Sequence, residues 1–353
     1  MMPTAYQRIQ NQQRFAPPAP WLRIRTIDLH TGGEPLRVIL DGFPPLRGNN
    51  VLEYRRYVRD NYDHLRRALM HEPRGHADMY GCLLLPPNDE GADFGILFLH
   101  NGGYSTMCGH ATIAIAILAA QMGWVDRRAP ETPVVIDAPC GRLQAFVRVE
   151  DGKIRGAYFH GVPSFVAGLD LEVDVPGLGP IRYDLAYGGA YYAYVDAGQI
   201  GLELTPAHYR RIIEAGMAIK RAVMASPQPV EHPFEPDLSF LYGTIFIGAP
   251  VTEGIGSRNV CVFAEGEVDR CPTGSGLSGR LPIHYARGEV TVGEAMTVES
   301  ITGSVFTGSI IREEQYGPYR AVIPCVEGTA FITGQHEFLV DPEDPFRHGF
   351  FLR

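Results

Sequence analysis

The sequence predicts a mixed α/β (α+β) protein whose two similar lobes meet at a cleft. Two segments carry this prediction: Met107-Cys108-Gly109-His110-Ala111-Thr112 and Asp269-Arg270-Cys271-Pro272-Thr273-Gly274-Ser275-Gly276. When Cys108 is placed on Thr273, the glycines that follow them coincide, and another glycine comes fifteen residues after each anchor. The 40 glycines and 28 prolines predict many turns, and therefore many strands. Two related helices, each beginning at a reactive position, favour a site between two lobes.

The length of the chain predicts two domains with ample hydrophobic core, since it has 353 residues. Residues 1–22 lack the apolar core of a signal peptide and are predicted to be a loose leader. Asp151-Gly152 is a turn signal and the predicted lobe boundary. We therefore expect a first lobe of residues 23–152 plus 335–353, and a second lobe of residues 153–334.

The first elements are strands around a turn, predicted at residues 21–28 and 36–40. Residues 52–70 are charged, with the period of a helix that faces solvent on one side. Residues 95–99 form an apolar run, typical of a buried strand, and a loop then leads to Cys108.

The segment after Cys108 predicts a buried helix. Gly109–Met122 is nearly uncharged and rich in Ala, Ile and Leu, and a helix that is apolar on all sides belongs in a core. Gly123 is a natural C-terminal stop for it. Strand signals follow at 134–136 and 142–149.

The second lobe repeats this alternation. Its strand signals lie at 157–159, 181–183, 191–195, 244–247, 260–263 and 330–334, and a surface helix is predicted at 206–225. A second buried helix should begin after Thr273. Pro282 lies nine residues beyond Thr273, so this helix is predicted to be bent or shorter than the first.

Composition excludes several classes of function. The net charge is −9 with no long basic run, which argues against nucleic acid as a partner. No apolar stretch is long enough to span a membrane. The six cysteines are scattered, which is typical of a reducing cytoplasm and not of a disulfide framework. Phosphate-binding loops, HExxH and CxxC pairs are absent from the sequence, which predicts neither metal nor cofactor.

Four ordered motifs resemble those of the proline racemase family. They are the segments 28–35, 74–81, 107–112 and 269–276, and the resemblance covers about residues 23 to 353. The family includes proline racemases, 4-hydroxyproline 2-epimerases and trans-3-hydroxy-L-proline dehydratases. The resemblance implies a diaminopimelate-epimerase-like fold of two pseudo-symmetric lobes, each a mixed sheet curled around a central helix, with the substrate in the cleft between them.

The second anchor distinguishes branches of this family. Racemases of the family have cysteine at both anchors, whereas Thr273 follows the proline here, a pattern that resembles the dehydratase branch. Cys271 precedes that proline at a position where the family commonly has serine, so we interpret it as structural. The alternative is that Cys271 substitutes for the missing base.

Cys108 suits the role of a catalytic base because it stands at the start of a helix. Unpaired N–H groups and the helix dipole favour a thiolate there and are expected to lower the pKa. The alternative is a buried, inert cysteine.

The substrate-binding residues follow from the resemblance. It implies that Gly109, His110, Gly274 and Ser275 bind the substrate carboxylate. It also implies that Asp269 and His110 hold the ring nitrogen. The alternatives are a helix cap for Asp269 and a loop hydrogen bond for His110.

Thr273 determines the expected reaction. Racemisation needs two groups that exchange protons near neutral pH, and a threonine hydroxyl is too weak an acid for this. Dehydration needs one base and a leaving hydroxyl. In trans-3-hydroxy-L-proline the Cα hydrogen and the hydroxyl share one face, so Cys108 can take the proton and then protonate the hydroxyl. The enamine formed would tautomerise to Δ1-pyrroline-2-carboxylate.

Other segments of the motifs are weaker candidates. Residues 74–78 and 100–102 either line the cleft or stabilise loops, and residues 187–192 either pack on the substrate ring or belong to the core. His30 and Glu34 are interpreted as structural. The alternative functions are a 4-hydroxyproline 2-epimerase or proline racemase, and, in another class, a non-catalytic amino-acid-binding protein. A homodimer is expected only by analogy.

Overall fold

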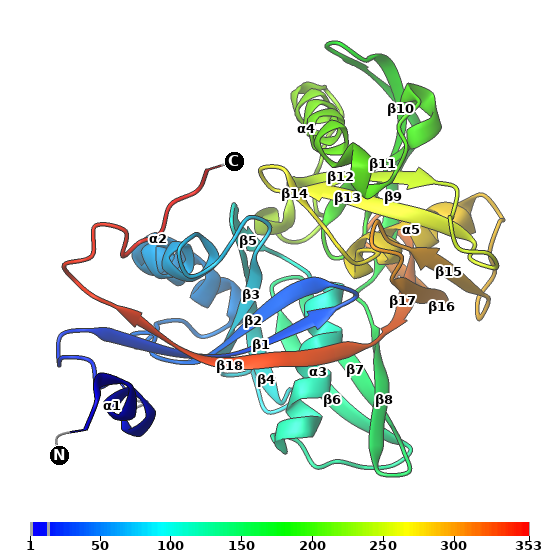
Figure 1. Ribbon diagram of the computed structural model, residues 1–353. Helices are drawn as coiled ribbons and strands as arrows, with labels where there is room; N and C mark the ends of the chain where they lie inside the picture. Colours follow the sequence, from blue (N-terminus) through cyan, green and yellow to red (C-terminus); the bar gives the residue numbers. More distant parts are fainter. Residues whose placement is uncertain (1–2, 13–14, 353) are drawn as a thin grey trace.

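The computed structural model describes residues 3–12 and 15–352, which form two groups of strands, each curled around one central helix (Figure 1). The elements of the first group are β1 (Leu22–Thr31), β2 (Glu34–Asp41), α2 (Val51–Met70), β3 (Tyr80–Leu85), β4 (Phe94–His100), β5 (Gly103–Ser105), α3 (Gly109–Met122), β6 (Glu131–Ala138), β7 (Gly141–Glu150) and β8 (Lys153–His160).

The second group follows along the chain. Its elements are β9 (Ser164–Val175), β10 (Gly179–Tyr187), β11 (Tyr191–Asp196), η1 (Ala197–Ile200), η2 (Pro206–His208), α4 (Tyr209–Ala225), η3 (Pro236–Leu238), β12 (Leu241–Gly248), β13 (Ser257–Phe263), β14 (Glu267–Val268), α5 (Gly274–Ala286), β15 (Ala295–Glu299), β16 (Val305–Tyr316) and β17 (Tyr319–Gly328). The last strand, β18 (Ala330–Val340), returns to the first group and pairs antiparallel with β1 over its whole length.

The two groups share one strand order, which confirms the predicted pair of similar lobes. In the first, β2 and β3 are parallel, β3 and β4 antiparallel, and β4 and β6 parallel. In the second, β11 and β12 are parallel, β12 and β13 antiparallel, and β13 and β15 parallel. The helices occupy equivalent places, since α2 and α4 precede β3 and β12, and α3 and α5 follow β5 and β14.

The predicted lobe limits at residues 152 and 334 stay a proposal. β8 begins directly after the first limit and pairs with β7 on one edge and with β17 on the other. β18 spans the second limit. The lobes are therefore joined through hydrogen-bonded strands.

The helix α3 forms as the sequence predicts. Twelve of its residues are buried, from Gly109 to Ala120, and the helix packs against β1, β2, β7 and β8. Cys108 is its N-cap, and Gly123 ends it in the left-handed conformation with φ of 70°. An apolar surface on every side explains why sheet surrounds the helix.

The helix α5 is the counterpart of α3, and it is shorter by one residue, with 13 against 14. Pro282 lies in the second half of this helix, which packs against β9, β10, β16 and β17. The proline therefore leaves the start of the helix intact. The predicted surface helix at 206–225 is divided into a 3-10 turn, η2, followed by α4.

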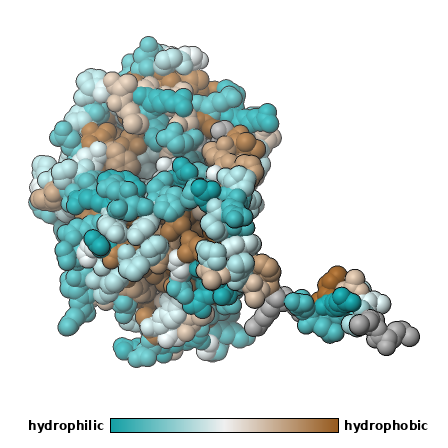
Figure 2. All heavy atoms as spheres, turned by 90° about the vertical axis from the view of Figure 1, so that its left-hand side faces the viewer, coloured by the Kyte–Doolittle hydropathy of each residue, from teal (hydrophilic) through white to brown (hydrophobic). Residues whose placement is uncertain are grey.

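The N-terminal segment contains α1 (Ala5–Asn11), a short helix with a capping box at Thr4 and no buried residues. It stands away from the two lobes (Figure 2). Residues 1–2 and 13–14 of the predicted leader lie outside the described residues. Among the helices that the structure describes, none has the length and apolarity needed to cross a membrane.

Candidate active site

The starts of α3 and α5 touch backbone to backbone. A methyl group added to Gly109 would lie 2.5 Å from the Cα of Gly274, and one added to Gly274 would lie 2.7 Å from the Cα of Gly109. Only glycine at both positions allows this approach. The first-turn N–H groups of two helices, each at the positive end of a helix dipole, therefore face one place.

A small cavity of about 20 Å³ lies at this junction. It is lined by Tyr80, Met107, Cys108, Gly109, His110, Tyr192, Tyr242, Phe263, Asp269, Thr273, Gly274 and Ser275. The volume is that of a single water molecule and is far too small for an amino acid. A substrate of that size therefore requires the residues around this junction to move apart.

All seven residues that the sequence places at the site line this cavity. They come from both lobes, and Cys108 and Thr273 are the N-cap residues of the two helices. The predicted register of the two anchors is thus reproduced in space.

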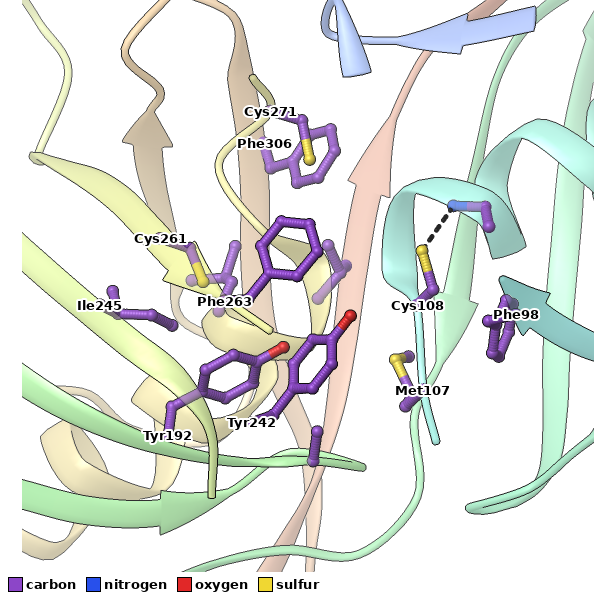
Figure 3. Packing of buried hydrophobic residues seen from close by; sticks show 14 of the residues in the cluster. Phe98, Met107, Cys108, Tyr192, Tyr242, Ile245, Cys261, Phe263, Cys271 and Phe306 are labelled. Atoms are coloured by element: carbon purple, nitrogen blue, oxygen red, sulfur yellow. Dashed lines mark hydrogen bonds between the residues drawn. The ribbon is translucent and has the colours of Figure 1, made fainter. Parts of the chain in front are cut away.

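Cys108 is held at the start of α3, where its Sγ accepts the N–H of Ala111 at 3.3 Å (Figure 3). Burial raises the pKa of the Cys108 thiol well above its ordinary value. The N–H of Ala111 and a hydrogen bond from the Tyr80 hydroxyl oppose this rise in pKa, while the carboxylates of Asp269 and Glu34 add to it. The expected lowering of the pKa is therefore wrong for this structure, because desolvation outweighs the helix dipole.

Thr273 is fixed in a strained conformation. Its φ is 65°, a left-handed value that is rare for a β-branched residue. Its Oγ1 donates to Oδ2 of Asp269 at 2.8 Å and makes no capping bond to α5. Asp269 also accepts the N–H of Cys271 at 2.8 Å, so it holds the turn before the helix and does not cap it. Strain of this kind commonly persists at functional sites.

His110 and Ser275 complete the polar wall of the cavity. The Nδ1 of His110 lies 3.1 Å from Sγ of Cys108, and its Nε2 lies 3.3 Å from the carbonyl oxygen of Pro35. Burial lowers the pKa of His110, so the ring is neutral near pH 7. The loop hydrogen bond considered as an alternative is present, and it orients the ring beside the thiol. Ser275 Oγ is 2.7 Å from the hydroxyl of Tyr192.

Cys271 is buried and does not line the cavity. Its Sγ accepts the N–H of Thr273 at 3.3 Å, and burial raises its pKa well above the ordinary value. Both features fit the structural interpretation, because a base must reach the substrate.

One group of side chains has the composition of a metal site. His110, Asp269 and Cys271 each offer one ligand atom, and these atoms all lie within 4.8 Å of one another. Nitrogen, oxygen and sulfur ligands together suit Zn²⁺. The sequence does not reveal this group, because its members lie in different lobes. That the enzyme works without metal stays a prediction.

Among the weaker candidates, the structure separates residues that stabilise loops from one that lines the cavity. Arg74 pairs with Asp344 at 3.1 Å, and Asn101 bridges loops through Met70. Neither residue lines the cavity, so loop stabilisation accounts for both. Within residues 187–192, Tyr192 reaches the cavity.

Tyr187 packs on Phe165 with ring centroids 5.1 Å apart. The turn at residues 30–35 is structural in the sense predicted, since His30 Nδ1 accepts the N–H of Gly33 at 3.2 Å. Glu34 Oε2 accepts the N–H of Arg270 at 2.8 Å, which ties this turn to the second lobe.

Four cavity residues were not predicted as site residues: Tyr80, Met107, Tyr242 and Phe263. Tyr80 and Met107 lie inside two of the sequence motifs, so their place in a motif could have identified them as site residues. Tyr242 and Phe263 lie on β12 and β13, where an aromatic residue in a strand is indistinguishable from core.

The fold and the paired helix starts define a two-lobed protein with one site between its lobes. Residues 26–351 match the proline racemase family, and the chain belongs to that family. A trans-3-hydroxy-L-proline dehydratase of Colwellia psychrerythraea is 46% identical over 334 residues, which cover 94% of each chain. A 3-hydroxyproline 2-epimerase of Burkholderia multivorans is 45% identical over 330 residues, covering 94% of this chain and 98% of its own.

A crystal structure of a hydroxyproline epimerase from Agrobacterium vitis, with bound trans-4-hydroxy-L-proline, has the same fold. Its TM-score is 0.87 at 32% identity, and the match covers 94% of this chain and 96% of that one. The mixed, two-lobed architecture predicted from the sequence is thereby confirmed.

Proposed function

We propose that the protein dehydrates trans-3-hydroxy-L-proline to Δ1-pyrroline-2-carboxylate. The observation that carries the proposal is the pair of anchors. Cys108 supplies one thiol to the cavity, and the equivalent position in the other lobe is Thr273, whose hydroxyl is bound to Asp269. A site with one proton-exchanging base suits elimination and not inversion. The name of the Colwellia relative agrees with this reaction.

Substrate binding in the proposal uses the helix starts. The carboxylate would accept N–H groups at Gly109, His110, Gly274 and Ser275, all of which border the cavity. Such donors also stabilise the charge that enters the carboxylate when the Cα proton is removed. Asp269 and the neutral His110 would hold the ring nitrogen.

The proposed chemistry proceeds on one face of the ring. The Cys108 thiolate takes the Cα proton, the electron pair forms the Cα–C3 double bond, and the C3–oxygen bond breaks. The leaving hydroxyl takes a proton and departs as water. The enamine then tautomerises to Δ1-pyrroline-2-carboxylate. We propose that Cys108 is the base and that the reaction needs no cofactor. Residues of the chain can bind the carboxylate, remove the Cα proton and assist the departure of the hydroxyl.

Epimerisation is the second candidate, and the name of the Burkholderia relative is the observation that favours it. It needs a second base on the opposite face of the ring. Cys271 is the thiol of the second motif, and its position outside the cavity lining weighs against it. A non-catalytic binding protein would need no thiol beside the carboxylate-binding groups.

We also propose a cytoplasmic location, supported by six cysteines that are all free. A homodimer is proposed by family analogy alone. The net charge of −9 supports a small-molecule partner and not nucleic acid.

The proposal is tested by incubating purified protein with trans-3-hydroxy-L-proline and measuring Δ1-pyrroline-2-carboxylate with o-aminobenzaldehyde or by mass. We expect prompt product, at the same rate after dialysis against EDTA. Chiral analysis of proline and trans-4-hydroxy-L-proline is run in parallel. Inversion of either at Cα without dehydration would favour the epimerase instead.

A further inference from the structure

Tyr242 brings to the cavity a hydroxyl group that has no role in the mechanism above. Tyr242 is the second residue of β12, and its side chain extends from the second lobe toward the side on which Cys108 lies (Figure 3). The residue is 6% exposed, and it lines the cavity. Its hydroxyl is buried and makes no well-formed hydrogen bond among the described residues, although the side chains of Ser105 and Tyr80 lie within reach of it.

The ring of Tyr242 is held firmly, so its hydroxyl has a defined position. It stacks on Phe263 with centroids 5.3 Å apart and meets the rings of His100 and Tyr192 edge-on at 5.7 and 5.8 Å. Burial is the largest influence on the pKa of Tyr242 and raises it, while Ser105 and Tyr80 lower this pKa and Cys108 adds to the rise.

The other two tyrosines of the cavity have partners. Tyr192 is bound to Ser275, and the Tyr80 hydroxyl donates to the Cys108 sulfur. Leaving a buried hydroxyl without a partner costs free energy, so such a group in a site is expected to bind a ligand atom.

We propose that Tyr242 binds the 3-hydroxyl of the substrate and donates its proton to that hydroxyl as it leaves. This inference rests on the dehydration proposed above and replaces Cys108 as the proton donor. The Cα proton goes to the Cys108 sulfur, the C3–oxygen bond breaks, and the Tyr242 proton completes the water molecule. The thiol proton then returns to the tyrosinate, which restores the thiolate and the phenol.

The surroundings of Tyr242 suit a donor. Burial raises the pKa of Tyr242 well above its ordinary value, so it holds its proton throughout the neutral range. The position also suits the stereochemistry, because syn elimination places the leaving hydroxyl on the same face as the base, and Tyr242 points toward Cys108.

The test compares two leaving groups in the variant Tyr242→Phe. Hydroxide needs a proton to leave, whereas fluoride does not, and both eliminations give the same ring product. We expect kcat/KM for trans-3-hydroxy-L-proline to fall at least about 100-fold, because general acids typically contribute this much. We expect kcat/KM for trans-3-fluoro-L-proline to stay within about threefold of the wild-type value, which is the margin we set for no effect.

Tyr187→Phe is the matched control. The Tyr187 hydroxyl is also buried without a hydrogen-bond partner, but the residue does not line the cavity. This variant should retain wild-type rates with both substrates. Binding of pyrrole-2-carboxylate, which has no ring hydroxyl, should be unchanged in both variants.

Each other outcome overturns the inference. Equal losses with both leaving groups would make Tyr242 a residue that positions the site, and an undiminished rate with the hydroxyl substrate would leave it without a role in the reaction. A wild-type protein that dehydrates nothing would instead refute the proposed function, and that result is obtained before any variant is made.

Discussion

The starts of α3 and α5 are equivalent positions of two similar lobes, yet they are built differently. Cys108 caps α3 in an extended conformation with φ of −145°, and its sulfur accepts an N–H of the helix. Thr273 stands before α5 with φ of 65°, and its hydroxyl turns away from the helix to Asp269. In the proposed reaction the two helix starts therefore share one carboxylate, while only one of them carries a base.

The largest expected effect is the loss of that base. Cys108→Ser replaces a thiol with a hydroxyl that does not ionise near neutral pH, so we expect the dehydration rate to fall by about 10³-fold or more. The rate of Δ1-pyrroline-2-carboxylate formation measures it. Cys271→Ser is the matched control and should keep activity within about threefold, which we take as the margin for no effect. Equal losses in the two variants would refute the assignment of the base.

A second prediction concerns the contact between the two helix starts. Gly109→Ala places a methyl group 2.5 Å from the Cα of Gly274, so the lobes can no longer close fully. A displacement of about 1 Å at a reacting centre can cost about 100-fold in rate, and we expect kcat to fall by about this factor. Circular dichroism and thermal melting would show that the variant still folds. Normal turnover would mean that the closed contact is dispensable.

The smallest expected effect is that of pH. In the proposed reaction the base is the Cys108 thiolate, and burial raises the pKa of Cys108 above its ordinary value. Below that pKa the thiolate fraction grows about tenfold for each pH unit. kcat/KM should therefore rise as pH increases through the neutral range, and Cys108→Ser should lose this dependence. A profile that falls with pH would indicate an acid as the limiting group.

The sequence predicts more of the fold than of the cavity. The bounds of α3 were predicted from its uninterrupted apolar composition and from Gly123, because a helix buried on all sides leaves a strong signal. The beginning of α4 was harder to predict from the sequence, because the 3-10 turn at Pro206–His208 continues the same amphipathic pattern. Pairing of β18 with β1 joins the two ends of the chain, and no local pattern specifies such a partner.

The site residues also differ in whether a local sequence pattern reveals them. Its polar residues lie in glycine-flanked motifs and were predicted together, whereas Tyr242 and Phe263 lie in apolar strands whose cavity-facing side chains look like core. The pKa of Cys108 was predicted in the wrong direction, because a helix start is visible in a sequence and the complete burial of its cap is not. Burial depends on the opposite lobe, which closes over the thiol.

The central claim is that one base, and not two, determines the reaction, and Thr273→Cys tests it most directly. A thiol at this position restores a second proton-exchanging group opposite Cys108. We predict that the wild-type protein gives no D-configured product from L-proline or trans-4-hydroxy-L-proline, and that Thr273→Cys gains measurable inversion at Cα by chiral chromatography. Inversion by the wild-type protein at a rate comparable with dehydration would contradict the account.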